Sequence, residues 1–555
     1  MEMKVASYVK KYRLQVAILV AFSIISAISS VVVPYLNGMF IDVLITTASA
    51  DEIVRFAFII IAIGLFGAFA SYICNMSVAK LTSKTSFDMM SDAIGHVQKI
   101  PYDKFISKFN PAYLIQRLST DVGVLLSFFI NNFISIFIQI ATFAVTVYVM
   151  MAINLQILFI SLAFLPIYLL CYMYLKKPML ERNIRYKEDS NHFSKTMFEQ
   201  INRVHEIKAE ASFEKSREIE KKSFSAYFGS MIGFSRISYL FTSLDGLIGV
   251  VFQSIVLIIG GIQIINGNMT IGEFTIVNTY FFMLLNVIKY FFNLGKSYQD
   301  YKASRIRMEE ILSIEKENNG DREVSGISLI KITDASYSYV DDGPLVTDGF
   351  SAEFKKGRIS LVLGPNGSGK TTLINILLGI LQNLRNGKVE YDGVNVSEID
   401  LYSARKDDIA VLLQRSDSPD STVEEYLQDC LELDRNEIIS MIRLMGLESI
   451  FAGKNFNIDK YWDSKIANIS GGERQKVMLL RTLGKGRNTI VLDEPSAGLD
   501  DFSIESLLKY LSAAKADKII VIISHDLRFR DYADDIIMVN PVQNNNSSGK
   551  HASML

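Results

Sequence analysis

Long stretches in the N-terminal half of the chain carry no charged side chain. Residues 14–41, 56–79 and 122–175 contain no Asp, Glu, Lys or Arg. Because a membrane-spanning helix needs about 20 apolar residues, the first two stretches predict one span each, and the third predicts two. Two further apolar stretches follow Asp245 and Glu273. The pattern therefore predicts six transmembrane helices, at about residues 14–37, 56–79, 124–151, 155–175, 243–266 and 272–294.

Basic residues lie on one side of these spans. Lys and Arg precede the first span and fill the connections between spans two and three and between spans four and five, whereas the other connections are short and almost free of them. Since basic loops stay in the cytoplasm, both termini are predicted to be cytoplasmic. The long connections are rich in Lys and Glu and low in Gly and Pro, which predicts helical extensions of the spans.

The pattern changes after a polar linker at residues 318–326. Short apolar runs at 359–363, 409–413, 489–492 and 518–523 alternate with helical stretches, which predicts an α/β domain with a largely parallel sheet. The predicted organisation is a transmembrane domain at 1–317, the linker, a nucleotide-binding domain at 327–540 and a disordered tail at 541–555. The fold class is a six-span all-α membrane domain followed by an α/β P-loop domain.

Composition excludes some functions. Hydrophobic residues make up 49% of the 555 residues and the net charge is −2, with no basic cluster interleaved with aromatic residues. A nucleic-acid partner is therefore not expected. The three cysteines, Cys74, Cys171 and Cys430, lack metal-ligand spacing, so they are expected to be small buried hydrophobes.

A phosphate-binding loop follows the first of these strands. Residues 364–371 read GPNGSGKT, between an apolar strand and a helical pattern, which is the context that the G-x-x-x-x-G-K-[ST] motif requires. Glycines let successive backbone N–H groups turn toward phosphate oxygens without Cβ clashes. Lys370 is placed to reach the terminal phosphates, and the Thr371 hydroxyl to bind Mg²⁺. The stretch predicts a nucleotide site.

Two further segments point to the same chemistry. The apolar run 489–492 ends in Asp493 and Glu494, at the end of a strand where open α/β sheets bind ligands. Asp493 is predicted to hold Mg²⁺, and Glu494 to orient the water that attacks the γ-phosphate; the alternative is a helix N-cap. Ser470 and Glu473 have capping-box spacing around two glycines, which suggests a helix start that approaches an anion closely rather than a simple capped helix.

The segments GPNGSGKT, ISGGERQ and IVLDEP, in this order and spacing, resemble the ATP-binding domain of ABC transporters. With six preceding spans, residues 14–540 resemble a half-transporter of the exporter type, and the phrases NGNMTIGEF (266–274) and ASRIRMEEIL (303–312) agree. The resemblance implies an ATPase coupled to transport, working with ATP and Mg²⁺ by alternating access. It also implies an obligate dimer, with itself or with a second half-transporter, in the bacterial cytoplasmic membrane and in contact with its lipid.

The resemblance assigns roles to matching positions. Tyr339 would stack on adenine, Gln414 would contact Mg²⁺ and sense the γ-phosphate, and His525 would contact the γ-phosphate. The implied catalytic residues are Glu494, His525 and Gln414; the Mg²⁺ ligands Thr371, Gln414 and Asp493; the ATP contacts of the same chain Tyr339, Gly364, Pro365, Asn366, Gly367, Ser368, Gly369, Lys370, Thr371 and Thr372; the ATP contacts supplied in trans Ser470, Gly471, Gly472 and Glu473; and the loop that crosses to the partner Ser496, Ala497, Gly498, Leu499 and Asp500.

Two short cytoplasmic helices of this family couple the domains, and by position they correspond to residues 110–117 and 199–206. The chain also departs from the family. The signature has Glu473 where glutamine is commoner, with little effect expected, and residues 462–466 lack the exporter's glutamate. This second departure puts the usual contact to the coupling helices in doubt, but not ATP hydrolysis.

Asp245 and Lys289 lie within or beside predicted spans, each about 20 residues, or about 30 Å, from the outer turn. They either line the substrate path or extend to the lipid headgroups. The predicted function is ATP-driven export of a hydrophobic or amphipathic peptide, drug or lipid from the cytoplasm. The alternative is a membrane-anchored, ATP-gated sensor that binds nucleotide without pumping. The sequence leaves open the cargo and the choice between homodimer and heterodimer.

Overall fold

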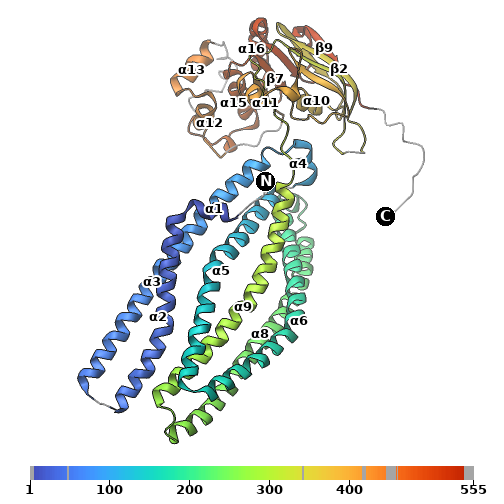
Figure 1. Cartoon of the computed structure of the whole chain (residues 1–555). Helices are drawn as coiled ribbons and strands as arrows, with labels where there is room; N and C mark the ends of the chain where they lie inside the picture. Colours follow the sequence, from blue (N-terminus) through green and yellow to red (C-terminus); the bar gives the residue numbers. More distant parts are fainter. Residues whose placement is uncertain are drawn as a thin grey trace. The chain divides into compact units, whose positions relative to one another are not determined.

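The computed structural model describes residues 5–46, 49–109, 111–340, 343–414, 420–444, 458 and 461–542. The chain divides into two compact units (Figure 1). The helical unit comprises Met1–Ala93 and Gln116–Ile311, and the α/β unit comprises Ile94–Ile115 and Leu312–Leu555. Residues 543–555 of the predicted tail lie outside the described residues, and the domain limits drawn from the sequence stay predictions.

Six long helices form the helical unit. They are α2 (Arg13–Thr46), α3 (Ala50–Val97), α5 (Pro111–Ile153), α6 (Leu155–Asn202), α8 (Phe213–Ile265) and α9 (Ile271–Leu312), preceded by the short α1 (Val5–Lys11). In the described part of the chain, five of them, all except α6, are long and apolar enough to cross a membrane. The sixth, α6, begins with the charge-free stretch that ends at Leu175. The predicted fold class of the membrane part is confirmed.

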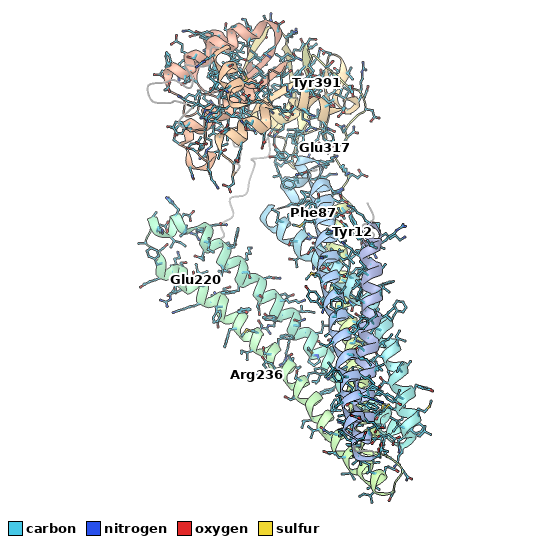
Figure 2. The ribbon with its side chains drawn as sticks, turned by 90° about the vertical axis from the view of Figure 1, so that its left-hand side faces the viewer. Tyr12, Phe87, Glu220, Arg236, Glu317 and Tyr391 are labelled. Atoms are coloured by element: carbon cyan, nitrogen blue, oxygen red, sulfur yellow. The ribbon has the colours of Figure 1, made fainter. Side chains whose placement is uncertain are left out.

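The predicted helical extensions are also confirmed. The helix α3 continues without interruption from its apolar stretch to Val97, and α6 continues to Asn202. Beyond the apolar stretches, α6 and α8 pack through stacked rings: Tyr186 lies 5.7 Å from Phe234, and Phe193 lies 5.4 Å from Tyr227. Figure 2 shows this pair, with Glu220 and Arg236 labelled, diverging from the other long helices.

The predicted positions of the short coupling helices were wrong. The first short helix is α4 (Tyr102–Lys108), and 111–117 instead form the first two turns of α5. The reason is Pro111: proline favours the first turn of a helix, so it begins a long helix here. Asn110 lies outside the described residues. The second short helix is α7 (Val204–Ala209), because α6 runs on to Asn202 and Arg203 separates the two.

Buried polar contacts join α9 to its neighbours in the helical unit. Asp121 of α5 is 1% exposed and accepts hydrogen bonds from Ser304 Oγ at 2.8 Å and from the Arg307 guanidinium. At the opposite end of α9, Asp42 of α2 accepts a hydrogen bond from Gly272 N at 2.8 Å. A carboxylate at a helix N-terminus is favourable, because it meets unpaired backbone N–H groups.

Two sheets form the α/β unit. One is antiparallel, with the order β2-β1-β4-β5, and the other is parallel, with the order β6-β7-β8-β3-β9. The strands are β1 (Leu329–Tyr337), β2 (Thr347–Lys355), β3 (Arg358–Leu363), β4 (Asn386–Tyr391), β5 (Val394–Asn395), β6 (Ile409–Leu412), β7 (Thr489–Asp493), β8 (Ile519–Ile523) and β9 (Asp535–Met538). The helices are α10 (Lys370–Leu377), α11 (Leu401–Asp407), α12 (Val423–Leu431), α13 (Arg435–Leu444), α15 (Gly471–Gly484) and α16 (Asp501–Ala514). The predicted parallel strands are present, whereas the antiparallel sheet was not predicted.

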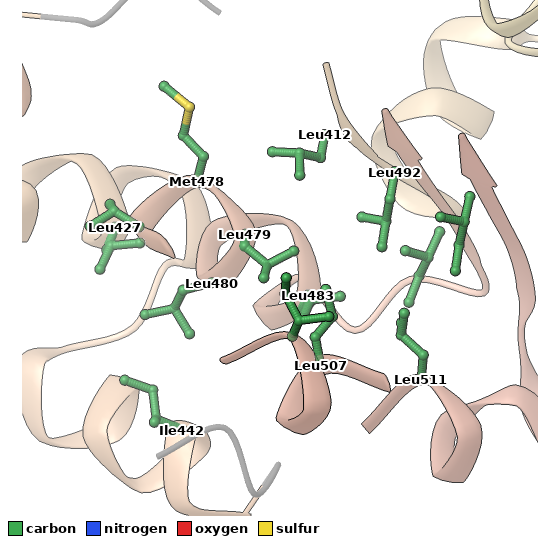
Figure 3. Packing of buried hydrophobic residues seen from close by; sticks show 14 of the residues in the cluster. Leu412, Leu427, Ile442, Met478, Leu479, Leu480, Leu483, Leu492, Leu507 and Leu511 are labelled. Atoms are coloured by element: carbon green, nitrogen blue, oxygen red, sulfur yellow. The ribbon is translucent and has the colours of Figure 1, made fainter. Parts of the chain in front are cut away.

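The helix α15 is fixed by a hydrophobic cluster on one side of the parallel sheet (Figure 3). Its Leu479 and Leu483 pack in the same cluster as Leu492 of β7 and Leu507 of α16, all less than 2% exposed. Complete burial of a leucine side chain contributes about 1.5–3 kcal/mol. This packing holds the first turn of α15, with Ser470 before it, in a fixed place beside the end of β7.

Candidate nucleotide-binding site

The loop of Gly364 to Thr371 joins β3 to α10 in the conformation that the motif predicts. Gly367 and Gly369 have φ of +80° and +92°, and Gly369 caps α10. A Cβ on Gly364 would lie 2.4 Å from Val539 O, so only glycine fits there. Lys370 Nζ donates to Gly364 O at 2.8 Å and Pro365 O at 3.0 Å. These acceptors are neutral, and phosphate oxygens would bind the ammonium more strongly.

The strand order brings the other candidate residues to the same edge. Gln414 follows β6, Asp493 ends β7 and His525 follows β8, and these strands neighbour one another next to β3. In a parallel sheet, the carboxyl ends of neighbouring strands form the ligand-binding edge. Residues 415–419, directly after Gln414, lie outside the described residues.

Glu494 has an unusual backbone. Its φ is +49°, a region that non-glycine residues rarely adopt, and its N–H donates to Ile523 O at 2.8 Å. The Glu494 carboxylate contacts His525. His525 Nε2 lies 3.5 Å from Glu494 Oε1, and the backbone N–H of His525 donates to Glu494 Oε2 at 3.4 Å. Strain of this kind persists only where the surroundings enforce it, and it clusters at functional sites.

Asp493 is buried and close to a second carboxylate. It is 4% exposed. Burial raises its pKa above the ordinary value, and the charge of Glu494 adds to this, while a backbone N–H of Gln414 and the charge of Lys370 act in the opposite direction. An ionised Asp493 therefore lies where more positive charge would stabilise it, which fits a divalent cation.

The Ser470 turn has the predicted capping box. Ser470 N–H donates to Glu473 Oε2 at 2.9 Å, and Glu473 N–H donates to Ser470 Oγ at 3.4 Å. Because Ser470 Oγ is the acceptor in this contact, its own proton stays available for an anion. Tyr461 OH donates to Glu473 Oε1 at 2.6 Å. Sequence reasoning missed this tyrosine, which nothing in the motif indicates.

The two glycines of this turn have different surroundings. A Cβ on Gly472 would lie 2.4 Å from Gly498 O, whereas a Cβ on Gly471 would meet no described residue within 4 Å. Gly472 therefore allows the close contact with the loop of Ser496 to Asp500. That loop is fixed at its end by Asp500, which caps α16 and lies 2.8 Å from Lys476 Nζ. Although burial raises it, hydrogen bonds from Lys476 and Ser503 hold the pKa of Asp500 at about 2.

Two family models match the chain, one after the other. The model of the ABC transporter transmembrane region matches residues 16–288, and the ABC transporter model matches residues 347–497. This chain belongs to the ABC transporter family. It is accordingly an ATPase coupled to transport and a multi-pass membrane protein of the exporter type.

Known proteins are similar to this chain along most of its length. The transport/processing ATP-binding protein ComA of Streptococcus pneumoniae is 24% identical over 548 residues, which are 97% of this chain and 75% of ComA. A lactococcin transport/processing ATP-binding protein, LcnC-like, of Lactococcus lactis is 22% identical over 86% of this chain and 66% of its own length. A bacterial Atm1-family ABC exporter with ATP bound has the same fold, with a TM-score of 0.78, 15% identity, and coverage of 96% of this chain and 94% of that one.

In the transporter, the environment of Asp493 leads to a prediction about stability. Because burial and Glu494 raise the pKa of Asp493 in the folded state, its ionised form destabilises the fold above that pKa. We expect Asp493→Asn to raise the melting temperature without nucleotide by about 2 °C at pH 7, while Mg²⁺-dependent ATP hydrolysis is lost. The gain should shrink as the pH falls toward the raised pKa, since wild-type Asp493 then takes up a proton. Thermal unfolding as a function of pH measures this.

Asp408 is the matched control, because it is also buried but accepts hydrogen bonds from Gly326 N at 2.9 Å and Asn488 Nδ2 at 2.6 Å. Asp408→Asn should lower the melting temperature. A lower melting temperature for Asp493→Asn as well would contradict the interpretation that Asp493 is strained by burial.

Tyr339 lies beside the end of the phosphate loop, and its stacking on adenine stays a prediction. Its hydroxyl lies 3.1 Å from Thr372 Oγ1, directly after the phosphate loop, and its ring meets the buried Tyr337 edge-on at 5.1 Å. Stacking on a base contributes about 1–3 kcal/mol, so we expect Tyr339→Ala to weaken ATP binding about tenfold. Tyr339→Phe keeps the ring and should bind ATP nearly as the wild type does. Equal losses in both variants, measured by titration with a fluorescent ATP analogue, would assign the effect to the hydroxyl instead.

The place of Asp245 and Lys289 along the substrate path stays a prediction. Lys289 is half-buried on α9. Asp245 lies in α8, and its side chain lies outside the described residues. Their proposed place along the substrate path is open to test by Asp245→Asn and Lys289→Met. Unchanged transport and substrate-stimulated ATP hydrolysis in both would end it.

Proposed function

We propose that this chain exports a hydrophobic or amphipathic cargo, a peptide, drug or lipid, from the cytoplasm by alternating access in a dimer. The observation that carries the proposal is the convergence of Lys370, Glu494 and His525 at one sheet edge in a chain with at least five membrane-long apolar helices in its described part. A complete hydrolytic set would have no use in a protein that only senses ATP. Two relatives, ComA and the LcnC-like protein, are transport ATP-binding proteins, which supports ATP-driven transport.

The dimer follows from the division of labour in the nucleotide site. The loop of Gly364 to Thr371 would bind the phosphates from one side, and the Ser470 turn of a second subunit would close over them. Two features of that turn support this role: the Ser470 Oγ proton is available for an anion, and the space around Gly471 is open. Each subunit would then provide half of two sites, whether the partner is a second copy or another half-transporter.

The residues at the sheet edge fit Mg²⁺. Thr371, Gln414 and Asp493 would hold the ion through oxygen atoms, the ligands that Mg²⁺ prefers, and the ion would neutralise charge on the phosphates. Glu494 would accept a proton from the attacking water. His525 lies next to the Glu494 carboxylate, where it would orient that carboxylate and contact the γ-phosphate. Burial of Asp493 keeps its carboxylate in one position for binding Mg²⁺.

Inverted membrane vesicles of a host that expresses the full chain provide the test. We expect uptake of hydrophobic fluorescent peptides, drugs or lipids that needs ATP and that is absent with Glu494→Gln. Both termini should face the outside of these vesicles and be accessible to protease. If ATP is hydrolysed but no cargo of any class accumulates, while nucleotide changes protease sensitivity, the sensor function replaces the exporter.

A further inference from the structure

A cavity of about 360 Å³ with mixed polar and apolar walls lies in the helical unit, between α2, α3 and α5. The polar side chains that line it are Ser23, Ser26 and Ser30 of α2, Asn75 of α3, and Asn131 and Ser135 of α5. Ser26 lies about 18 Å along α2 from the start of the apolar stretch at Leu14, so the cavity lies at membrane depth. Polar groups at this depth that face a cavity are commonly functional.

Helix packing accounts for Ser23, which is buried against Cys74 of α3, but not for Ser26 and Ser30. Small residues at this spacing usually let two membrane helices approach closely. On α2, however, the close approach uses a different face: a Cβ on Gly67 of α3 would lie 2.1 Å from Ser29 Oγ, and Ser29 donates to Ile63 O. Ser26 and Ser30 instead line a cavity in the size range of ligand sites.

Asn75 and Asn131 are exposed at the walls of the cavity, and part of their hydrogen-bonding capacity is not used within the protein. Asn75 Nδ2 donates to Ser71 Oγ at 3.5 Å, and Asn131 Nδ2 donates to Ser127 Oγ at 3.0 Å. Among the described residues, neither amide oxygen receives a hydrogen bond and the Ser26 hydroxyl makes none. Since a primary amide has two N–H donors and one carbonyl acceptor, both asparagines offer a donor and an acceptor together.

The lining also carries no formal charge: none of the described residues around the cavity is Asp, Glu, Lys, Arg or His. An ionised group would enter without a counter-charge, which is costly at low dielectric. A purely apolar group would leave the amides unpaired, which also costs free energy. A secondary amide, with one N–H and one C=O, meets both requirements.

We propose that this cavity, which we call the amide cavity after Asn75 and Asn131, binds the uncharged backbone of a hydrophobic peptide cargo. The two asparagines would form hydrogen bonds with its peptide bonds. The inference rests on the proposed export function for its purpose, but binding itself needs no ATP hydrolysis. Cys74 provides a reporter, because it lines the same cavity with its Sγ 3.0 Å from Ser23 Oγ.

The test measures how fast N-ethylmaleimide labels Cys74 in the full chain with Cys171→Ser and Cys430→Ser, in vesicles without nucleotide. The probe is the neutral peptide N-acetyl-trileucine amide, and its matched partner is the ester analogue in which backbone N–H groups are replaced by oxygen. At one concentration, near the dissociation constant of the peptide or above it, we expect the peptide to slow labelling several-fold and the ester to slow it far less, because each lost amide hydrogen bond weakens binding several-fold.

Asn75→Leu and Asn131→Leu should each remove most of this protection. The control is Ser254→Ala, on α8, whose hydroxyl bonds Val250 O within its own helix and does not line the cavity; its protection should equal that of the parent. Thermal unfolding and size-exclusion profiles verify that all variants fold. Four outcomes would overturn the proposal. The ester could protect Cys74 as well as the peptide does, or both asparagine changes could leave the protection unaffected. Monoolein could protect Cys74 where the peptide does not, or no compound could protect it.

The proposed export function fails differently. Loss of ATP-dependent uptake in the wild type, with peptide protection of Cys74 retained, would refute export and leave the amide cavity in place.

Discussion

Glu494→Gln is expected to abolish steady-state ATP hydrolysis while ATP still binds. Glutamine has the size of glutamate and keeps an oxygen for the His525 N–H, so the strained turn at φ +49° should persist. Glutamine cannot take a proton from the attacking water, and loss of a general base costs about 10²–10⁴-fold in rate. Phosphate release measures the turnover, and the upward shift of the melting temperature with MgATP measures binding.

Glu505→Gln is the matched control for this variant. Glu505 is exposed on α16, where it pairs with Lys509 at 2.8 Å, and exposed pairs contribute at most about 1 kcal/mol. Hydrolysis should be unchanged. If Glu494→Gln still turns over at a rate close to that of the wild type, the base is another group, and the role of Glu494 is limited to holding His525.

Much of this site was accessible from sequence, because it depends on local pattern. Apolar runs that end in glycine or in paired carboxylates predicted β3 and β7, and the phosphate loop has the glycine conformations its motif requires. By contrast, nothing in the sequence marks Glu494 for a positive φ, since the residue is not glycine. That conformation depends on the hydrogen bond to Ile523 of the neighbouring strand.

Contacts between distant segments were the least predictable. The approach of Gly472 to Gly498 joins the first turn of α15 to a loop 26 residues later, and it requires both glycines at once. The antiparallel sheet was missed because β1 and β2 have bulged registers that interrupt their alternation of polar and apolar residues. The short helix α4 was placed too late in the chain, because Pro111 was taken as part of a short helix rather than as the start of α5.

Mixing two inactive variants should restore ATP hydrolysis, if the nucleotide site is shared between subunits. Lys370→Ala removes the phosphate-binding ammonium, and Gly471→Glu places a bulky anion where a Cβ meets none of the described residues of its own chain. Each homodimer is then inactive at both sites. A mixed dimer carries both defects in one site and leaves the other intact, so an equal mixture of the two chains should recover about one quarter of wild-type activity.

The control mixes Lys370→Ala with Glu494→Gln. Both changes affect residues that the same chain brings to one sheet edge, so each site of this mixed dimer keeps one defect and no activity should return. Recovery with Gly471→Glu but not with Glu494→Gln identifies the Ser470 turn as the part supplied in trans. Failure of both mixtures, with mixed dimers verified by two affinity tags, would mean that each chain completes its own site or pairs with a different half-transporter. Recovery in both would contradict the assignment of Lys370 and Glu494 to one site.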